Sequence, residues 1–143
     1  MEQAHSDTYI SPFSARYASK EMSYLFSPHF RALLFRRLWI ALAKAQKKLG
    51  LPISQKQIAT MQKRVEKIDF SSIRDYEKKF RHDVMAHLYA FGDLCPLAKP
   101  ILHLGATSTY VTDNADLIIF KEAFSLLFAK LVRVLRLLAS FAK

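Results

Sequence analysis

Residues 117–142 read LIIFKEAFSLLFAKLVRVLRLLASFA, and their apolar side chains are spread nearly all the way around a helix. A helix of about 30 residues that includes this stretch spans roughly 45 Å. The part of the chain that precedes it is too small to cover such a length, so the apolar surface needs other long helices as partners. We therefore interpret the stretch as the first long helix of a central bundle in a larger fold.

The same stretch is not expected to cross a membrane, because five charged residues interrupt it: Lys121, Glu122, Lys130, Arg133 and Arg136. No window reaches the roughly 18 uncharged residues that a transmembrane helix needs. The chain opens with no signal-like pattern of basic residues followed by an apolar run, and its single cysteine, Cys95, has no partner for an internal disulfide. These observations predict a cytoplasmic protein.

The composition predicts an all-α fold. The chain has 143 residues, of which 51% are hydrophobic and 13% aromatic, as expected for a folded globular protein. Only three glycines and five prolines are available for turns, which favours long helices over many short strands. No internal repeat or low-complexity tract is visible.

Helix boundaries are marked by capping residues. Ser27 and Pro28 predict the start of a helix of about six turns, and Gly50 predicts its end. Ser54 and Gln57 have the spacing of a capping box and predict a second, shorter helix. Residues 1–26 show no sustained period, so we expect an ordered but mostly irregular lead-in.

A third helix is predicted from around residues 69–72 to Gly92, with one buried stripe. The stripe consists of Ile73, Tyr76, Phe80, Val84, Leu88 and Phe91. On this continuous helix His82 lies about 200° around from Phe80 and points away from the stripe. The loop that follows, residues 92–105, is expected to be irregular or to form a short helical turn.

The last helix is predicted to be capped by Thr112 or Asp113 and to run to the last residue. From this helix start we predict two domains. Residues 1–111 form a small helical amino-terminal domain, and residues 112–143 form the first helix of a truncated central bundle.

The formal charge of +10 attracts polyanions. The basic residues are nevertheless scattered over all the predicted helices, with no zinc-ligand spacing, arginine-rich tract or aromatic-glycine RNA-binding motif. We therefore expect small anions or a solvated basic surface, and we do not expect nucleic acid as the partner.

Two neighbouring motifs have the composition of an active site. Residues 103–118 combine an imidazole, a glycine turn, two hydroxyls and a helix start, and they follow closely on RHDVMAH at residues 81–87. Together with SPFSARYAS at residues 11–19, HLGATS at 103–108 and DNADL at 113–117, these motifs resemble the amino-terminal third of adenylosuccinate lyase in the fumarase/aspartase superfamily. The resemblance covers essentially the whole chain.

The resemblance implies a reaction and a substrate. The family eliminates fumarate from adenylosuccinate to give AMP, and from the succinylated imidazole-carboxamide ribotide of purine biosynthesis. A substrate with one phosphate and two carboxylates needs cations and hydrogen-bond donors at both ends. By resemblance, Arg16 and Tyr17 hold the phosphate side, Arg81, His82 and Asp83 line the nucleotide and succinyl region, and Thr107 and Ser108 donate to a succinyl carboxylate. The family implies a homotetramer, no cofactor and no metal.

The two proton-transfer groups of the family are not expected within residues 1–143. The family's base is a serine on a mobile glycine-rich loop and its acid is a histidine of the second domain, and no Gly-Ser-Ser sequence occurs here. We therefore predict that the chain is a fragment with binding residues but no principal catalytic residue. The alternative is a non-catalytic helical interaction protein derived from the lyase, in which the site is vestigial.

The remaining polar residues of these motifs have structural interpretations. His87 and His103 are predicted to be structural histidines. Asp113, Asn114 and Asp116 are predicted to be helix-start residues near the anionic site.

Overall fold

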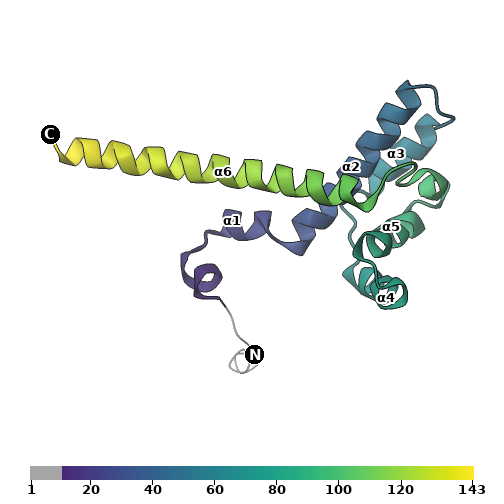
Figure 1. The fold of residues 1–143 in the computed structure, drawn as a ribbon, viewed down its shortest axis with the longest axis horizontal. Helices are drawn as coiled ribbons and strands as arrows, with labels where there is room; N and C mark the ends of the chain where they lie inside the picture. The colour runs from purple at the N-terminus through teal and green to yellow at the C-terminus, as the bar shows by residue number, and fades with distance from the viewer. Residues whose placement is uncertain (1–10) are drawn as a thin grey trace.

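The structure is a computed structural model that describes residues 11–143, and within this range every regular element is helical (Figure 1). This confirms the predicted all-α class. In chain order the elements are a π-helical turn η2 (Phe13–Tyr17), α1 (Lys20–Leu25), α2 (Pro28–Lys48), α3 (Gln55–Arg64), α4 (Phe70–Phe80), α5 (Asp83–Leu94), a 3₁₀-helix η3 (Pro96–Ile101) and α6 (Ser108–Phe141).

The caps of α2 and α3 are those that the sequence predicts. The Ser27 hydroxyl accepts the Phe30 N–H at 3.2 Å, and Pro28 occupies the first turn of α2. Gly50 follows the helix with φ +92°, a conformation that glycine adopts without strain. At the start of α3, Ser54 and Gln57 form both hydrogen bonds of the capping box.

The lead-in is more regular than predicted. Residues 1–10 lie outside the described range, but helical structure begins at Phe13, and α1 is capped by the Ser19 hydroxyl, which accepts the Met22 N–H at 3.3 Å. Six residues are too few to show a hydrophobic period, so the pattern concealed α1. The feature of the sequence that indicates α1 is the capping residue Ser19, with the acidic Glu21 in the first turn.

The single helix predicted over residues 69–92 is wrong, because two helices, α4 and α5, occupy this stretch. Arg81 ends α4 in the left-handed conformation, with φ 51° and ψ 39°, and its N–H donates to the Glu77 carbonyl. His82 then caps α5. Each helix buries its own apolar residues, and Ile73 of α4 shares one cluster with Ala86 and Ala90 of α5. The spacing of the apolar residues in the sequence therefore continues across the break between α4 and α5, which only the backbone conformation reveals.

The other boundaries differ by smaller amounts. α5 passes through Gly92 and ends at Leu94, and a Cβ at Gly92 would lie 2.9 Å from Cγ of Lys99. The loop after α5 contains the helical turn η3, as one of the two sequence interpretations expects. α6 begins at Ser108 with Thr107 as its N-cap residue, five positions before the expected cap at Thr112. The division into domains 1–111 and 112–143 stays a prediction.

The main core gathers around Trp39 of α2, which is 1% exposed. It receives buried side chains from α3, α5, η3 and α6, among them Ile58, Phe91, Ala98 and Val111. The indole stacks on the Phe91 ring, with the centroids 6.2 Å apart. α2, α3, α5 and η3 thereby form one packed unit from which the long α6 departs (Figure 1).

Arg36 is the one buried charged residue within the described range, at 2% exposure. Its Nη1 donates to the carbonyl oxygens of Arg64, Val65 and Lys67, at 3.1, 3.1 and 2.6 Å. The guanidinium carbon lies 4.6 Å from the centroid of the Phe91 ring. Burial lowers the Arg36 pKa to about 10, so the group remains charged at neutral pH. Arg36 therefore joins α2 to the carboxyl end of α3.

Only the first part of α6 belongs to this core. Val111, Ala115, Ile119 and Ala123 are buried at four-residue steps, and no later residue of the helix is buried. Figure 1 shows α6 projecting far beyond the other helices, with its carboxyl end free of neighbours. Phe124 and Phe128 are 69% and 68% exposed. The sequence-based expectation that this chain cannot cover its last helix is thus confirmed. Across residues 11–143, no helix is both long enough and apolar enough to span a bilayer.

Candidate functional site

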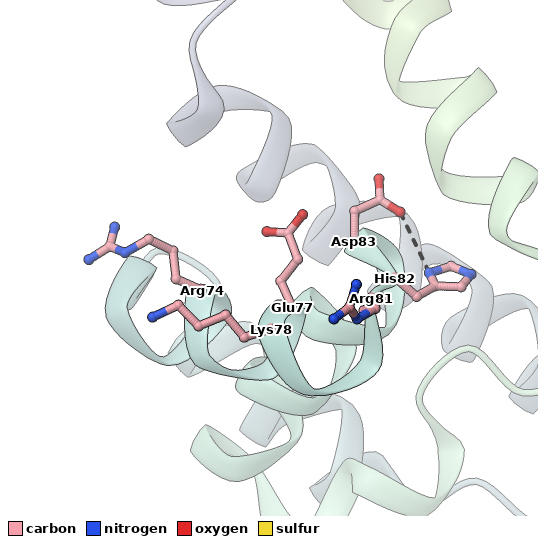
Figure 2. A pocket seen from close by; sticks show the side chains of 6 residues that line it. All are labelled: Arg74, Glu77, Lys78, Arg81, His82 and Asp83. Carbon is pink, nitrogen blue, oxygen red and sulfur yellow. Dashed lines mark ion pairs between the residues drawn. The ribbon is translucent and has the colours of Figure 1, made fainter.

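A pocket lies at the break between α4 and α5. It has a volume of about 840 Å³ and is lined by Arg74, Glu77, Lys78, Arg81, His82 and Asp83. Figure 2 shows these side chains along one edge of α4 and at the start of α5, with the His82 ring directed away from Arg74 and Lys78. Because the left-handed turn at Arg81 separates the two helices, His82 is the N-cap residue of α5 and does not lie on one continuous helix. Its side chain still lies outside both apolar clusters, as predicted.

His82 connects this pocket to the start of α6. Its Nε2 lies 3.3 Å from the Ser108 hydroxyl oxygen, although the two residues are 26 positions apart. Its Nδ1 lies 3.4 Å from the Met85 N–H nitrogen and 3.5 Å from Oδ1 of Asp83. A neutral ring protonated at Nε2 accepts from Met85 and donates to Ser108, whereas a doubly protonated ring pairs with Asp83. The His82 ring therefore joins the start of α5 to the start of α6.

The other predicted hydroxyl is at the N-cap of α6. The Thr107 and Thr109 hydroxyl oxygens lie 2.6 Å apart, and the Thr107 side chain makes no capping hydrogen bond. The first backbone N–H groups of a helix have no intrahelical partner and favour anions. Thr107 and Ser108 thus add hydroxyl and backbone donors beside His82, as a carboxylate ligand requires.

Arg16 and Tyr17 are not brought to this pocket within one chain. Both lie on η2, where Tyr17 is 74% exposed. Figure 1 shows η2 beyond α1, on the opposite side of the molecule from α4 and α5. Of the seven predicted site residues, five therefore cluster around the α4–α5 break and the start of α6: Arg81, His82, Asp83, Thr107 and Ser108.

Sequence reasoning missed the cations of α4 that extend the pocket. Arg74 and Lys78 line it together with Arg81, and the three residues have the i, i+4, i+7 spacing of one helix face. This spacing in the sequence could have indicated that Arg74 and Lys78 belong to the same site as Arg81.

The acidic residues after Thr112 were wrongly predicted to mark the helix start, since α6 begins at Ser108. Asp116 pairs with Arg31 of α2, and Thr112 donates to Asp113 at 3.0 Å. Asn114 donates from Nδ2 to the Tyr110 carbonyl at 2.7 Å. These side chains support α6 and its packing on α2.

His103 and His87 have structural contacts. The Trp39 indole N–H donates to Nδ1 of His103 at 2.9 Å, and burial followed by the nearby His82 lowers the pKa of His103. The His87 ring meets the Phe35 ring edge-on, with centroids 5.4 Å apart. Burial, followed by the positive charge of Arg36, lowers the His87 pKa to about 4.

We expect His87 to make the fold acid-sensitive. The ordinary His pKa is 6.5 and the folded value is about 4. Between these values the unfolded chain binds a proton that the folded chain excludes, so stability falls as the pH drops through this window. The expected loss is about 2 to 3 kcal/mol. Urea unfolding at several pH values should show this loss in the wild type and in the exposed-site control His29→Gln, and a much smaller one in His87→Gln. An equal loss in His87→Gln would contradict the assignment.

The sequence is similar to curated adenylosuccinate lyases over most of its length. The adenylosuccinate lyase of Saccharomyces cerevisiae is 49% identical over 139 residues, which is 95% of this chain. Those of Schistosoma mansoni and Schizosaccharomyces pombe are each 46% identical, over 136 and 138 residues. The chain is a relative of the adenylosuccinate lyases. It spans 29%, 28% and 29% of the lengths of these three enzymes, respectively. No protein-family model matches the chain.

The likeness to adenylosuccinate lyase also extends to archaeal sequences at lower identity. The enzyme named adenylosuccinate lyase in Pyrococcus abyssi is 26% identical over 135 residues, or 94% of this chain. The matches therefore include both the pocket of α4 and α5 and the long α6.

Proposed function

We propose that this chain supplies the substrate-binding part of an adenylosuccinate lyase, which eliminates fumarate from adenylosuccinate and from the succinylated imidazole-carboxamide ribotide. The observation that carries the proposal is the 3.3 Å approach of His82 and Ser108 beside a pocket lined by Arg74, Lys78 and Arg81. A hydroxyl, an imidazole and several cations suit a ligand that carries both carboxylate and phosphate groups.

The proposed roles follow from the positions of these groups. Thr107 and Ser108 donate to a succinyl carboxylate at the start of α6, where the helix dipole adds to the attraction. His82 donates to the ligand or to the developing charge, and Asp83 lies 3.5 Å from Nδ1 of its ring. Arg81 adds a fixed positive charge. None of these residues is assigned as the base or acid of the elimination.

Arg16 and Tyr17 have their proposed phosphate-binding role only in an assembly. Because η2 and the pocket are separated in one chain, we propose that η2 of one copy reaches the pocket of another, in a homo-oligomer whose sites are shared between subunits. The exposed apolar part of α6 supports such an assembly, and it also supports the second candidate, a helical interaction protein that binds no substrate.

Calorimetric titration of adenylosuccinate into the chain separates these two functions. We expect saturable binding, and we expect His82→Ala to weaken it at least about tenfold because it removes a donor in the pocket. His29→Ala is the matched control, since His29 is also exposed but lies outside the pocket. Absence of binding in the wild type, or equal binding by His82→Ala, would reject the substrate-binding function.

We further expect residues 1–143 alone to release no fumarate from adenylosuccinate. General acid and base groups are each typically worth about 10² to 10⁴ in rate, and none of the residues proposed above supplies either group. The ultraviolet absorbance change of adenylosuccinate measures the reaction. Turnover that purifies with the chain and disappears in His82→Ala would overturn this expectation.

A further inference from the structure

The hairpin of α2 and α3 has an unusual charge distribution. Between Met22 and Val65 the sequence contains nine lysines and arginines and no aspartate or glutamate. Six of these cations have exposed side chains: Arg37, Lys44, Lys48, Lys56, Lys63 and Arg64. Within residues 11–143, none of these six side chains forms an ion pair. The Lys and Arg ion pairs there join Arg31 with Asp116, Lys78 with Asp75 and Lys99 with Asp93. The basic surface of the hairpin is thus not neutralised within the described chain.

A groove of about 350 Å³ lies on this surface. Its α2 side consists of Arg37, Ile40, Ala41 and Lys44, which have the i, i+3, i+4, i+7 spacing of one helix face. Its α3 side consists of Gln62 and Val65. The groove therefore combines an apolar strip with a cation at each end of the α2 face.

Arg36 strengthens the positive potential below this groove. The carboxyl end of a helix carries partial negative charge, which repels anions. At α3 this end is covered, because Nη1 of Arg36 donates to the carbonyl oxygens of Arg64 and Val65. The guanidinium is buried without a carboxylate among its hydrogen-bond partners, so its charge adds to those of Arg37 and Lys44.

We propose that the α2–α3 groove is a docking site for an acidic amphipathic segment of a partner protein. Carboxylates of the segment pair with Arg37 and Lys44, while an apolar side chain packs on Ile40, Ala41 and Val65. Nucleic acid fits less well, because its phosphate backbone leaves the apolar strip uncovered and no aromatic residue lines the groove for stacking. The site is separate from the pocket at His82 and does not depend on its substrate.

The test uses a short fluorescein-labelled peptide helix with Glu on one face and Leu on the other. Fluorescence anisotropy should show binding to the wild-type chain, at least about tenfold weaker binding of the same peptide with Gln in place of Glu, and a similar loss in Arg37→Glu/Lys44→Glu. The matched control Lys20→Glu/Lys79→Glu makes the same change in net charge on α1 and α4 and should retain the wild-type affinity.

Three results would overturn the proposal. The first is an equal loss of affinity in both double variants, which indicates attraction to net charge only. The second is wild-type affinity in Arg37→Glu/Lys44→Glu. The third is tighter binding of a short DNA duplex than of the Glu peptide at the same salt concentration, abolished by the α2 substitutions. Circular dichroism checks the fold, and Arg37→Gln/Lys44→Gln replaces the charge reversal if that variant unfolds.

Discussion

Residues 1–143 are expected to self-associate through the exposed part of α6. Eleven large apolar side chains from Leu117 to Phe141 are between 50% and 90% exposed. Burial of one Leu or Phe side chain is worth about 1.5 to 3 kcal/mol, so even a fraction of this surface exceeds the usual cost of association. Analytical ultracentrifugation at micromolar concentration should therefore show oligomers.

The control for this result keeps the helix and removes its apolar surface. Phe124, Phe128, Leu131 and Leu135 follow one another at three- and four-residue steps, so their replacement by Gln preserves helix propensity while making one face polar. This variant should sediment as a smaller species. A wild-type chain that sediments as a monomer with full helical content would show that the exposed surface does not drive association.

Arg36→Leu is expected to destabilise the fold by about 3 to 4 kcal/mol. The substitution removes the donor shared by the Arg64, Val65 and Lys67 carbonyls and the cation that lies over Phe91. Arg37→Leu is the matched control, because it changes the same residue type at the next position, where the side chain is exposed. Its effect should stay within about 0.5 kcal/mol.

Urea unfolding measures both substitutions. To keep them comparable, both are made in the α6 variant with the four Gln replacements, so that association does not contribute to stability. If Arg36→Leu costs no more than Arg37→Leu, the buried guanidinium contributes no net stability over an apolar side chain, as is known for some buried charges.

The candidate site could be predicted only in part. The motifs supplied His82, Ser108 and their neighbours, because imidazole, hydroxyl and cationic residues appear directly in the sequence. The contact between His82 and Ser108 could not be predicted, since it depends on the turn at Arg81 and on how α6 packs. Arg74 and Lys78 were missed because solvated cations on a helix are common, and only the pocket gives them a function.

The sequence by itself determined the helical class, the caps of α2 and α3, and the excess apolar surface of the last helix. Each of these depends on local spacing or on composition, which the chain carries whatever its tertiary packing. The break between α4 and α5, the start of α6 at Ser108 and the burial of Arg36 were decided only by the tertiary structure. A left-handed arginine and a buried guanidinium are locally unfavourable, so they exist because packing and long-range hydrogen bonds offset their cost. Thr107 is a favourable cap, but Thr112 is one as well, so local preference alone did not decide where α6 begins.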